Sequence, residues 1–354
     1  MNITIQKNVL DNILTSLQPF LDKKDASNIT SHIYLEVKDQ KLTCKATDFE
    51  MGLYTISDSL LITEEGIATV NGKQILDVIK SLKEGEINLY AENEHLNIKQ
   101  NKSYFKLPMF DASEFPKFPD YENFEKLEIS SLDIINSMKK IFPVVDTNNH
   151  KRELNGALLD IKEYSYSFVA SDTKRLSVIK FEKPSGKSLS LIFPKKSILE
   201  IQKLFYDNVE LFYSEKDIAI RSQNYVFFSH LINGKFPDYE KIMPKEAKIE
   251  LNLPKSSIID GIRLVNAVTN DAKLTFKKNE ICFESLHKDF EAKTQIEIEL
   301  NLEEEIEVGI NSRHVLDFLG QIETANFNWI LNGKNAPFIL KSENFSSVIM
   351  PIVI

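Results

Sequence analysis

The tetrapeptide Phe118-Pro119-Asp120-Tyr121 recurs 118 residues later as Phe236-Pro237-Asp238-Tyr239. A residue that precedes proline avoids the helical region, so each copy indicates an extended stretch of chain. Charged residues follow both copies, as is common in linkers between domains. The repetition predicts that each tetrapeptide lies near the end of one folded unit.

A second pattern occurs three times: a cation, any residue, a β-branched apolar residue, leucine and an acid. Its copies begin at Lys73, Lys196 and Arg313. Each copy follows a helix-start residue and continues with apolar residues at helical spacing. These start residues are Asn71, Pro194 and Asn311. The pattern therefore predicts one equivalent helix in each of three units.

An alternating strand followed by an amphipathic helix opens each unit, at 3–17, 127–141 and 249–267. Sequence of period 2, typical of antiparallel strands, closes each unit. We therefore expect an α+β fold made of three tandem copies of a two-helix, antiparallel-sheet domain, with roughly eight strands in each copy. The predicted domains are 1–122, 123–245 and 246–354. The alternative is chance similarity of amphipathic patterns, which the common order of the markers disfavours.

The composition is that of a globular protein, with 42% hydrophobic and 27% charged residues among 354. The apolar run Val348–Ile354 is too short to cross a bilayer, and the N-terminus lacks the apolar core of a signal peptide. Cys44 and Cys282 are expected to be buried thiols in strands, with no disulfide. These features predict a cytoplasmic protein without a membrane partner.

The net charge of −9 argues against DNA binding unless positive charge is concentrated on one surface. The six predicted helices, 7–17, 71–82, 131–141, 194–206, 255–267 and 311–321, carry eleven cations and six acids, a net charge of +5. In one of them, Lys196, Glu200 and Lys203 share a face opposite the apolar residues. A solvated helix face explains any single helix, but the bias across all six favours an anionic partner that is contacted through its phosphates. The candidate helix residues are Lys73, Lys80, Lys195, Lys196, Lys203 and Arg313.

We find no motif that indicates catalysis. The stretch that ends in Gly186-Lys187-Ser188 has Phe181 where a phosphate-binding loop needs its first glycine. The six histidines lack metal-ligand spacing, so no metal, cofactor or catalytic residue is predicted. A hydrolase or transferase remains the alternative, and it would need an acid–base pair that converges only in the fold.

The sequence resembles the beta subunit family of bacterial DNA polymerase III, the sliding clamps. The resemblance covers essentially the whole chain. The segments that carry it are Leu154-Asn155-Gly156, Ala170 to Leu176, Asn233 to Tyr239, Val315-Leu316-Asp317 and Met350-Pro351. It implies a non-enzymatic processivity factor that encircles duplex DNA without base specificity and serves the replicative polymerase, the clamp loader and other clamp-binding proteins.

The resemblance also implies a homodimer that pairs head to tail into a ring. The pairing would join an edge strand at Ser103–Leu107 to one at Thr294–Leu300, and the alternative is an unpaired edge protected by charge. The implied interface residues are Lys102, Phe105, Lys106, Leu107, Glu297, Glu299, Glu303 and Glu304. By the same resemblance, Lys24, Asn148 and Arg152 are added to the DNA-contacting set.

Finally, the resemblance implies a cleft between the second and third domains that docks partner peptides. The implied residues are Leu154, Thr173, Arg175, Leu176, Pro237, Lys241, Ile242, Asn311, His314, Pro337, Val348, Met350, Pro351 and Ile352. The chain departs from the family at several of them. This chain has Thr173-Lys174 where the family usually has Gly-His, Lys241 where it usually has arginine, and His314 where tyrosine is common. The departures bear on peptide preference and leave ring formation unaffected.

Overall fold

A computed structural model describes residues 1–25, 27–244, 247–287, 289, 291–333 and 335–354. Within these residues the chain forms six α-helices and twenty-five strands. Each helix begins and ends within two residues of its predicted bounds, so the six predicted helices are confirmed. They are α1 (Lys7–Leu17), α2 (Gly72–Ser81), α3 (Ser131–Ile141), α4 (Lys195–Leu204), α5 (Lys255–Asn266) and α6 (Ser312–Leu319).

Local sequence explains where these helices begin and which face they bury. The Asn71 side chain caps α2 by accepting a hydrogen bond from the Gln74 amide, and Asn311 caps α6 in the same way. Helix α1 buries Leu10, Ile13, Leu14 and Leu17, which lie on one face at helical spacing.

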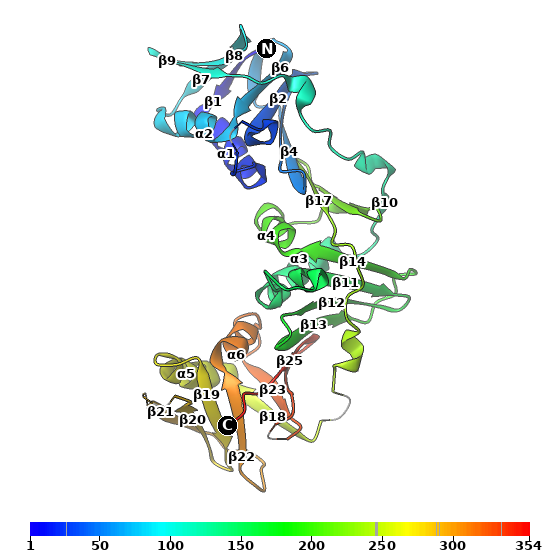
Figure 1. The fold of residues 1–354 in the computed structure, drawn as a ribbon, viewed down its shortest axis with the longest axis vertical. Coiled ribbons are helices and arrows are strands. Elements are labelled where there is room, and N and C mark those ends of the chain that lie inside the picture. The colour runs from blue at the N-terminus through cyan, green and yellow to red at the C-terminus, as the bar shows by residue number, and fades with distance from the viewer. Residues whose placement is uncertain (26, 245–246, 288, 290, 334) are drawn as a thin grey trace. The chain divides into compact units, whose positions relative to one another are not determined.

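The chain divides into two compact units. Unit 1 comprises Met1–Leu132 and Glu200–Leu231, and unit 2 comprises Asp133–Leu199 and Ile232–Ile354 (Figure 1). Residues of the predicted central domain, 123–245, therefore occur in both units. The boundary predicted between residues 245 and 246 lies outside the described residues.

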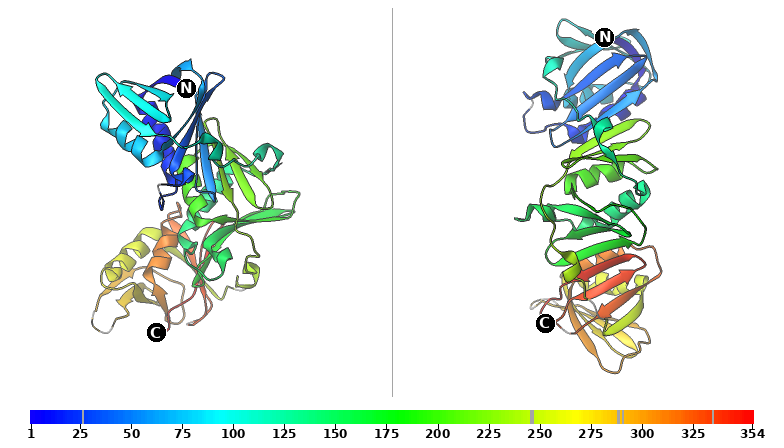
Figure 2. Two further views of the ribbon diagram at one scale, coloured as in Figure 1. Left: turned by 45° about the horizontal axis from the view of Figure 1, so that its top comes forward. Right: turned by 90° about the vertical axis from the view of Figure 1, so that its right-hand side faces the viewer.

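Unit 1 contains one five-stranded and one eight-stranded antiparallel sheet. In spatial order, the first sheet is β5 (Leu60–Glu64), β1 (Asn2–Gln6), β7 (Glu86–Glu92), β8 (His95–Gln100) and β9 (Ser103–Pro108). The second is β10 (Glu125–Lys126), β15 (Glu210–Tyr213), β16 (Asp217–Arg221), β17 (Tyr225–His230), β4 (Met51–Ser57), β3 (Lys41–Thr47), β2 (His32–Lys38) and β6 (Gly66–Asn71). Helices α1 and α2 pack side by side and contact strands of both sheets, as the blue and cyan part of Figure 2 shows.

Unit 2 contains one eight-stranded and one four-stranded antiparallel sheet. The larger sheet is β14 (Leu189–Pro194), β11 (Gly156–Lys162), β12 (Ser165–Ser171), β13 (Arg175–Phe181), β25 (Phe345–Ile349), β24 (Phe338–Ser342), β23 (Asn326–Leu331) and β18 (Ile249–Pro254). The smaller is β21 (Lys293–Glu297), β20 (Glu280–Ser285), β19 (Asp271–Phe276) and β22 (Ile306–Asn311). Helix α5 contacts strands of both sheets, so the apolar core lies between helix and sheet as in unit 1. Cys44 and Cys282 are buried in β3 and β20, as predicted.

One strand pair in each unit joins strands from neighbouring repeats. We call β4–β17 in unit 1 the first junction and β13–β25 in unit 2 the second junction. The bonds that flank them correspond. The His230 amide donates to the Glu50 carbonyl (2.8 Å) as Met350 does to Lys174 (2.9 Å). At the other end, Ile56 donates to Asn224 (3.1 Å) as Lys180 does to Asn344 (3.0 Å). The two junctions therefore have the same register.

Candidate functional site

A tight turn leads into β13 at the second junction. Asp172 Oδ1 accepts hydrogen bonds from the backbone amides of Lys174 and Arg175, both at 3.0 Å. The Ser171 hydroxyl donates to the Arg175 carbonyl at 2.9 Å. Thr173, between them, has a φ of +71°, a left-handed conformation that glycine adopts easily and a β-branched residue does not. The turn therefore fixes the backbone of Arg175, and Thr173 adopts a strained backbone conformation within it.

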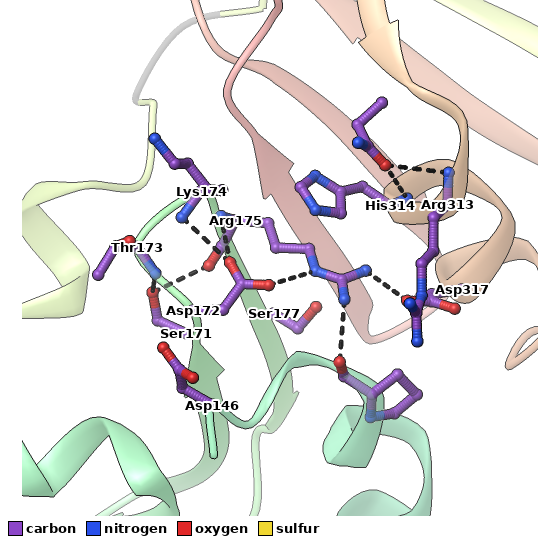
Figure 3. Close-up of polar contacts among 12 residues, drawn as sticks. Asp146, Ser171, Asp172, Thr173, Lys174, Arg175, Ser177, Arg313, His314 and Asp317 are labelled. Carbon is purple, nitrogen blue, oxygen red and sulfur yellow. Dashed lines mark hydrogen bonds and ion pairs between the residues drawn. The ribbon is translucent and has the colours of Figure 1, made fainter. Parts of the chain in front are cut away.

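The guanidinium of Arg175 is buried, and each of its three nitrogens donates a hydrogen bond. Its Nε donates to Asp172 (2.9 Å), its Nη1 to Asp317 of α6 (2.8 Å) and its Nη2 to the Pro143 carbonyl (2.9 Å) (Figure 3). Its side chain is only 5% exposed. A buried charge needs such partners, and removing them leaves it uncompensated. Arg175 therefore ties the start of β13 to helix α6.

His314 lies beside this network and points towards the Arg175 side chain (Figure 3). Its Nδ1 is buried and has no hydrogen-bond partner among the described residues. Burial lowers the pKa of His314, and the nearby positive charge of Arg175 lowers it further. The imidazole is therefore kept neutral at the pH where most proteins work.

An apolar pocket of about 200 Å³ opens next to the turn, entirely within unit 2. Its lining residues are Lys151, Leu154, Ser171, Thr173, Lys174, Arg175, Leu176, Phe236, Pro237, Tyr239, Ile242, Val348 and Met350. Leu154, Leu176 and Val348 also belong to the buried hydrophobic cluster beneath it, so the base of the pocket is held by core packing. Tyr239 is fixed by a hydrogen bond from its hydroxyl to Asp160 (2.9 Å), and burial raises the pKa of that hydroxyl. The arrangement suits apolar side chains of a short ligand.

The first junction carries different side chains at the place equivalent to this pocket. There the cross-strand pair is Gly52 and Phe228, and a Cβ on Gly52 would collide with the Phe228 ring. Phe118 packs on the same ring, with centroids 4.8 Å apart. At the second junction the equivalent pair is Leu176 and Val348. Both of these side chains line the pocket, whereas at the first junction the ring of Phe228 lies directly on Gly52.

Eight of the fourteen predicted cleft residues line this pocket: Leu154, Thr173, Arg175, Leu176, Pro237, Ile242, Val348 and Met350. The other six, Lys241, Asn311, His314, Pro337, Pro351 and Ile352, are not among its lining residues. Asn311 caps α6, and Lys241 pairs with Asp238 at 2.8 Å. The prediction missed Phe236 and Tyr239 as lining residues, although both belong to the recurring Phe-Pro-Asp-Tyr tetrapeptide. It also missed Lys151, Ser171 and Lys174.

The predicted DNA-contacting residues differ in how exposed their side chains are. Lys24, Lys73, Lys80, Asn148, Arg152, Lys196, Lys203 and Arg313 are exposed. Lys195 is half-buried, and its ammonium donates to the Val145 carbonyl (2.5 Å) and lies over the Phe142 ring. The expectation of an exposed face shared by Lys196, Glu200 and Lys203 is wrong for Glu200, which is 5% exposed. Lys203 pairs with the buried Glu200 carboxylate at 2.9 Å, so this acid serves an ion pair within the helix.

Comparison with known proteins agrees with this geometry. Family models of the DNA polymerase III beta subunit match at residues 1–119 (N-terminal domain), 128–238 (central domain) and 240–353 (C-terminal domain). The beta sliding clamp of Helicobacter pylori strain J99 is 41% identical over 375 residues, with all of both chains covered. The chain belongs to the DNA polymerase III beta subunit family.

Solved structures agree at the level of the fold. The crystal structure of Helicobacter pylori beta clamp bound to DNA ligase peptide has a TM-score of 0.95 and 41% identity, with 100% of each chain covered. The DNA polymerase III subunit beta of Pseudomonas aeruginosa has a TM-score of 0.91 at 23% identity, again over 100% of each chain, which supports the fold alone.

The chain is therefore a sliding clamp, a non-catalytic processivity factor of DNA polymerase III that acts in DNA replication. The alternative of a hydrolase or transferase has no support from these relatives. Among the described residues no helix is long and apolar enough to span a membrane, and no group of three or more potential ligands could hold a metal ion.

The two strands predicted to join clamp subunits both lie at sheet edges. Strand β9 contains Phe105, Lys106 and Leu107, and Lys102 lies in the turn before it. Strand β21 contains Glu297. The predicted strand Thr294–Leu300 is wrong in its bounds, because β21 is Lys293–Glu297 and the chain then turns towards β22. Glu299, Glu303 and Glu304 accordingly lie in the segment between these strands.

Proposed function

We propose that two copies of this sliding clamp pair head to tail through β9 of one copy and β21 of the other, and so close a ring around duplex DNA. The internal repeat supports this pairing. Strands β4, β13 and β21 occupy equivalent places in the three repeats, and so do β17, β25 and β9. Two of the three possible pairs form within the chain, as the first and second junctions. The third pair of edges remains open within one chain.

The register of the two junctions predicts the register of the third. In the second junction the Lys180 amide donates a hydrogen bond to the Asn344 carbonyl. The equivalent residues at the third pair of edges are Gln295 and Lys102, so we expect the Gln295 amide to donate to the Lys102 carbonyl of the other copy. It follows that Ala292 lies opposite Phe105 and Glu291 opposite Lys106. Opposite charges across a strand pair stabilise it and disfavour wrong registers.

An exposed apolar side chain supports the same interface. Phe20 and Val144 occupy equivalent positions after α1 and α3, and they are 0% and 4% exposed. Phe20 packs on Phe227 of the first junction, with ring centroids 5.9 Å apart. Val268 takes this position after α5 and is 43% exposed in the single chain. In the proposed ring it would be covered by Phe105, the equivalent of Phe227.

The positive helices supply the surface for DNA. With the observed bounds the six helices still carry eleven cations and six acids. Four of these acids, Asp11, Asp133, Glu200 and Asp317, are already held in ion pairs with side chains of the same chain. Lys73 and Lys80 are exposed and form no ion pair with any described residue. Weak phosphate contacts of this kind allow sliding, because the ring holds DNA by linkage and not by affinity.

Retention on DNA tests the linkage. After loading, the clamp should remain on circular DNA at high salt and be lost from linear DNA through its ends. Lys73→Ala combined with Lys80→Ala should weaken the salt-sensitive contacts and leave retention on circles unchanged, since topology is intact. Equal, salt-resistant retention on circular and linear DNA would rule out the tether.

We also propose that the pocket of the second junction docks short peptides of replication proteins such as the polymerase, the clamp loader and ligase. The structure of the Helicobacter pylori relative was solved with a DNA ligase peptide bound. The apolar base formed by Leu154, Leu176 and Val348 and the polar rim formed by Lys151 and Lys174 fit an apolar anchor with polar neighbours. The remaining predicted residues, Lys241, Asn311, His314, Pro337, Pro351 and Ile352, would shape the rim. We place the ring in the cytoplasm, with the replication machinery.

A further inference from the structure

The opening strands of the first and third repeats differ in whether a further strand pairs with their outer edge. Strand β1 opens the first repeat, and β5 pairs with its outer edge, with Ile3 opposite Ile62. Strand β18 opens the third repeat, and it is the last strand of its sheet. The segment equivalent to β5 lies between β21 and β22, but it bonds elsewhere. The amides of Ile298 and Leu300 donate to the carbonyls of Asn279 (3.0 Å) and Lys278 (2.7 Å).

Because the segment after β21 bonds to the β19–β20 turn and not to β18, a groove remains along the edge of β18, within unit 2. The groove encloses about 630 Å³, three times the volume of the peptide pocket. One wall is the strand edge, at Lys248–Asn252, and the other is the returning segment, at Glu299–Ile306. An edge strand presents a row of backbone donors and acceptors that can pair with another strand. The groove therefore has the place and the shape of a missing strand, the one that β5 provides in the first repeat.

The walls of the groove are strongly acidic. Five glutamates line it, Glu250, Glu299, Glu303, Glu304 and Glu305, against one cation, Lys248. All five are exposed, and none forms an ion pair with a described residue. Ile249, Leu302 and Ile306 are half-buried between them. Like charges held this close repel one another, so a positively charged occupant would be favoured.

We propose that this groove binds an extended basic segment of a partner protein by strand addition to β18. The occupant takes the place that β5 has in the first repeat. Its backbone pairs with the β18 edge, and lysine or arginine at alternate positions meets the glutamates. The apolar residues between them contact Ile249 and Leu302. This second docking surface shares no lining residue with the peptide pocket, and it assigns Glu299, Glu303 and Glu304, which follow β21, to the groove and not to the subunit interface.

A defined probe tests the proposal on the full chain. A fluorescein-labelled octapeptide of alternating lysine and valine should bind, as measured by fluorescence anisotropy. Glu250→Lys with Glu305→Lys should lower its affinity at least tenfold. The matched control is Glu163→Lys with Glu182→Lys, two exposed glutamates outside the groove, and it should bind the probe as the parent does. No binding to the parent, or equal binding to both double variants, would refute the proposal.

A second probe separates strand pairing from charge alone. Methylating alternate backbone nitrogens removes the donors on one edge of the peptide and keeps its charge. The methylated probe should bind at least tenfold more weakly, and hydrogen exchange of β18 amides should slow only with the unmodified probe. Equal binding of the two probes would show that an acidic surface, and not a strand edge, captures the peptide.

Discussion

The two internal junctions share one backbone framework and differ in what fills it. The turn Thr47–Met51 repeats the bonds of Ser171–Arg175, with Phe49 at a φ of +71° where Thr173 has the same value. The first junction ends this turn with buried Met51 and covers Gly52 with Phe228. The second has Arg175 and the pair Leu176 and Val348, and it keeps an open pocket. The same framework therefore yields a closed core at one junction and a binding site at the other through a few side chains.

The largest effect on stability is expected where the first junction is packed. Phe228→Ala should lower the free energy of unfolding by about 3–5 kcal/mol, because it leaves a cavity over Gly52. Val348→Ala at the equivalent place should have a smaller effect, because space is already open there. Urea denaturation of both variants checks the comparison, and equal losses would show that the junctions are packed alike.

Filling the pocket should remove the binding site at the second junction, as the first junction has a packed core at the equivalent place. Val348→Phe should push a ring into the pocket, because Leu176 fills the place that Gly52 leaves for the ring of Phe228. It should weaken binding of an apolar clamp-binding peptide about a hundredfold, or about 2.7 kcal/mol. Titration calorimetry measures the change. Val348→Ile, which adds one methyl group, is the control and should retain most of the affinity. Undiminished binding to the phenylalanine variant would place the peptide elsewhere.

Arg175 is the other residue that distinguishes the junctions. Arg175→Met copies Met51 and should destabilise the chain by about 2 kcal/mol, because Asp172 and Asp317 lose their partner while they remain partly exposed. Adding Asp317→Leu should recover part of this loss by removing an uncompensated carboxylate. If the double variant is less stable than the single one, the ion pair is not the reason for the loss.

The smallest predicted effect concerns what the two turns share. Thr173→Gly and Phe49→Gly should each stabilise the chain by about 1 kcal/mol, because glycine adopts the left-handed conformation without strain. Both side chains are exposed, so little packing is lost. Thermal unfolding measures the gain. A loss at either position would mean that the side chain there makes a contact worth more than the strain.

Much of this architecture could be predicted from the sequence. The apolar spacing and the caps at Asn71 and Asn311 located the helices, because both signals are local. The burial of Glu200 and the engagement of Lys195 with Val145 could not be predicted, since they depend on which elements pack against α4. The end of β21 was missed because period-2 sequence continues to Leu300, while the amides of Ile298 and Leu300 bond to the β19–β20 turn. Phe236 and Tyr239 belong to the tetrapeptide that marks the repeat and the family resemblance, and neither pattern indicates that these two side chains line a pocket.

The most direct test of the ring is a covalent closure of its third junction. In the second junction the hydroxyls of Ser177 and Ser347 are 3.0 Å apart, and Ala292 and Phe105 of the other copy are the equivalent pair. Cysteines at both positions should therefore lie within disulfide reach across the interface. In the proposed ring, Ala292→Cys with Phe105→Cys should give, after oxidation, a covalent dimer on a denaturing gel that stays on circular DNA. If the chains remain monomeric there, while the shifted pair Thr294→Cys with Phe105→Cys cross-links instead, the proposed register is contradicted.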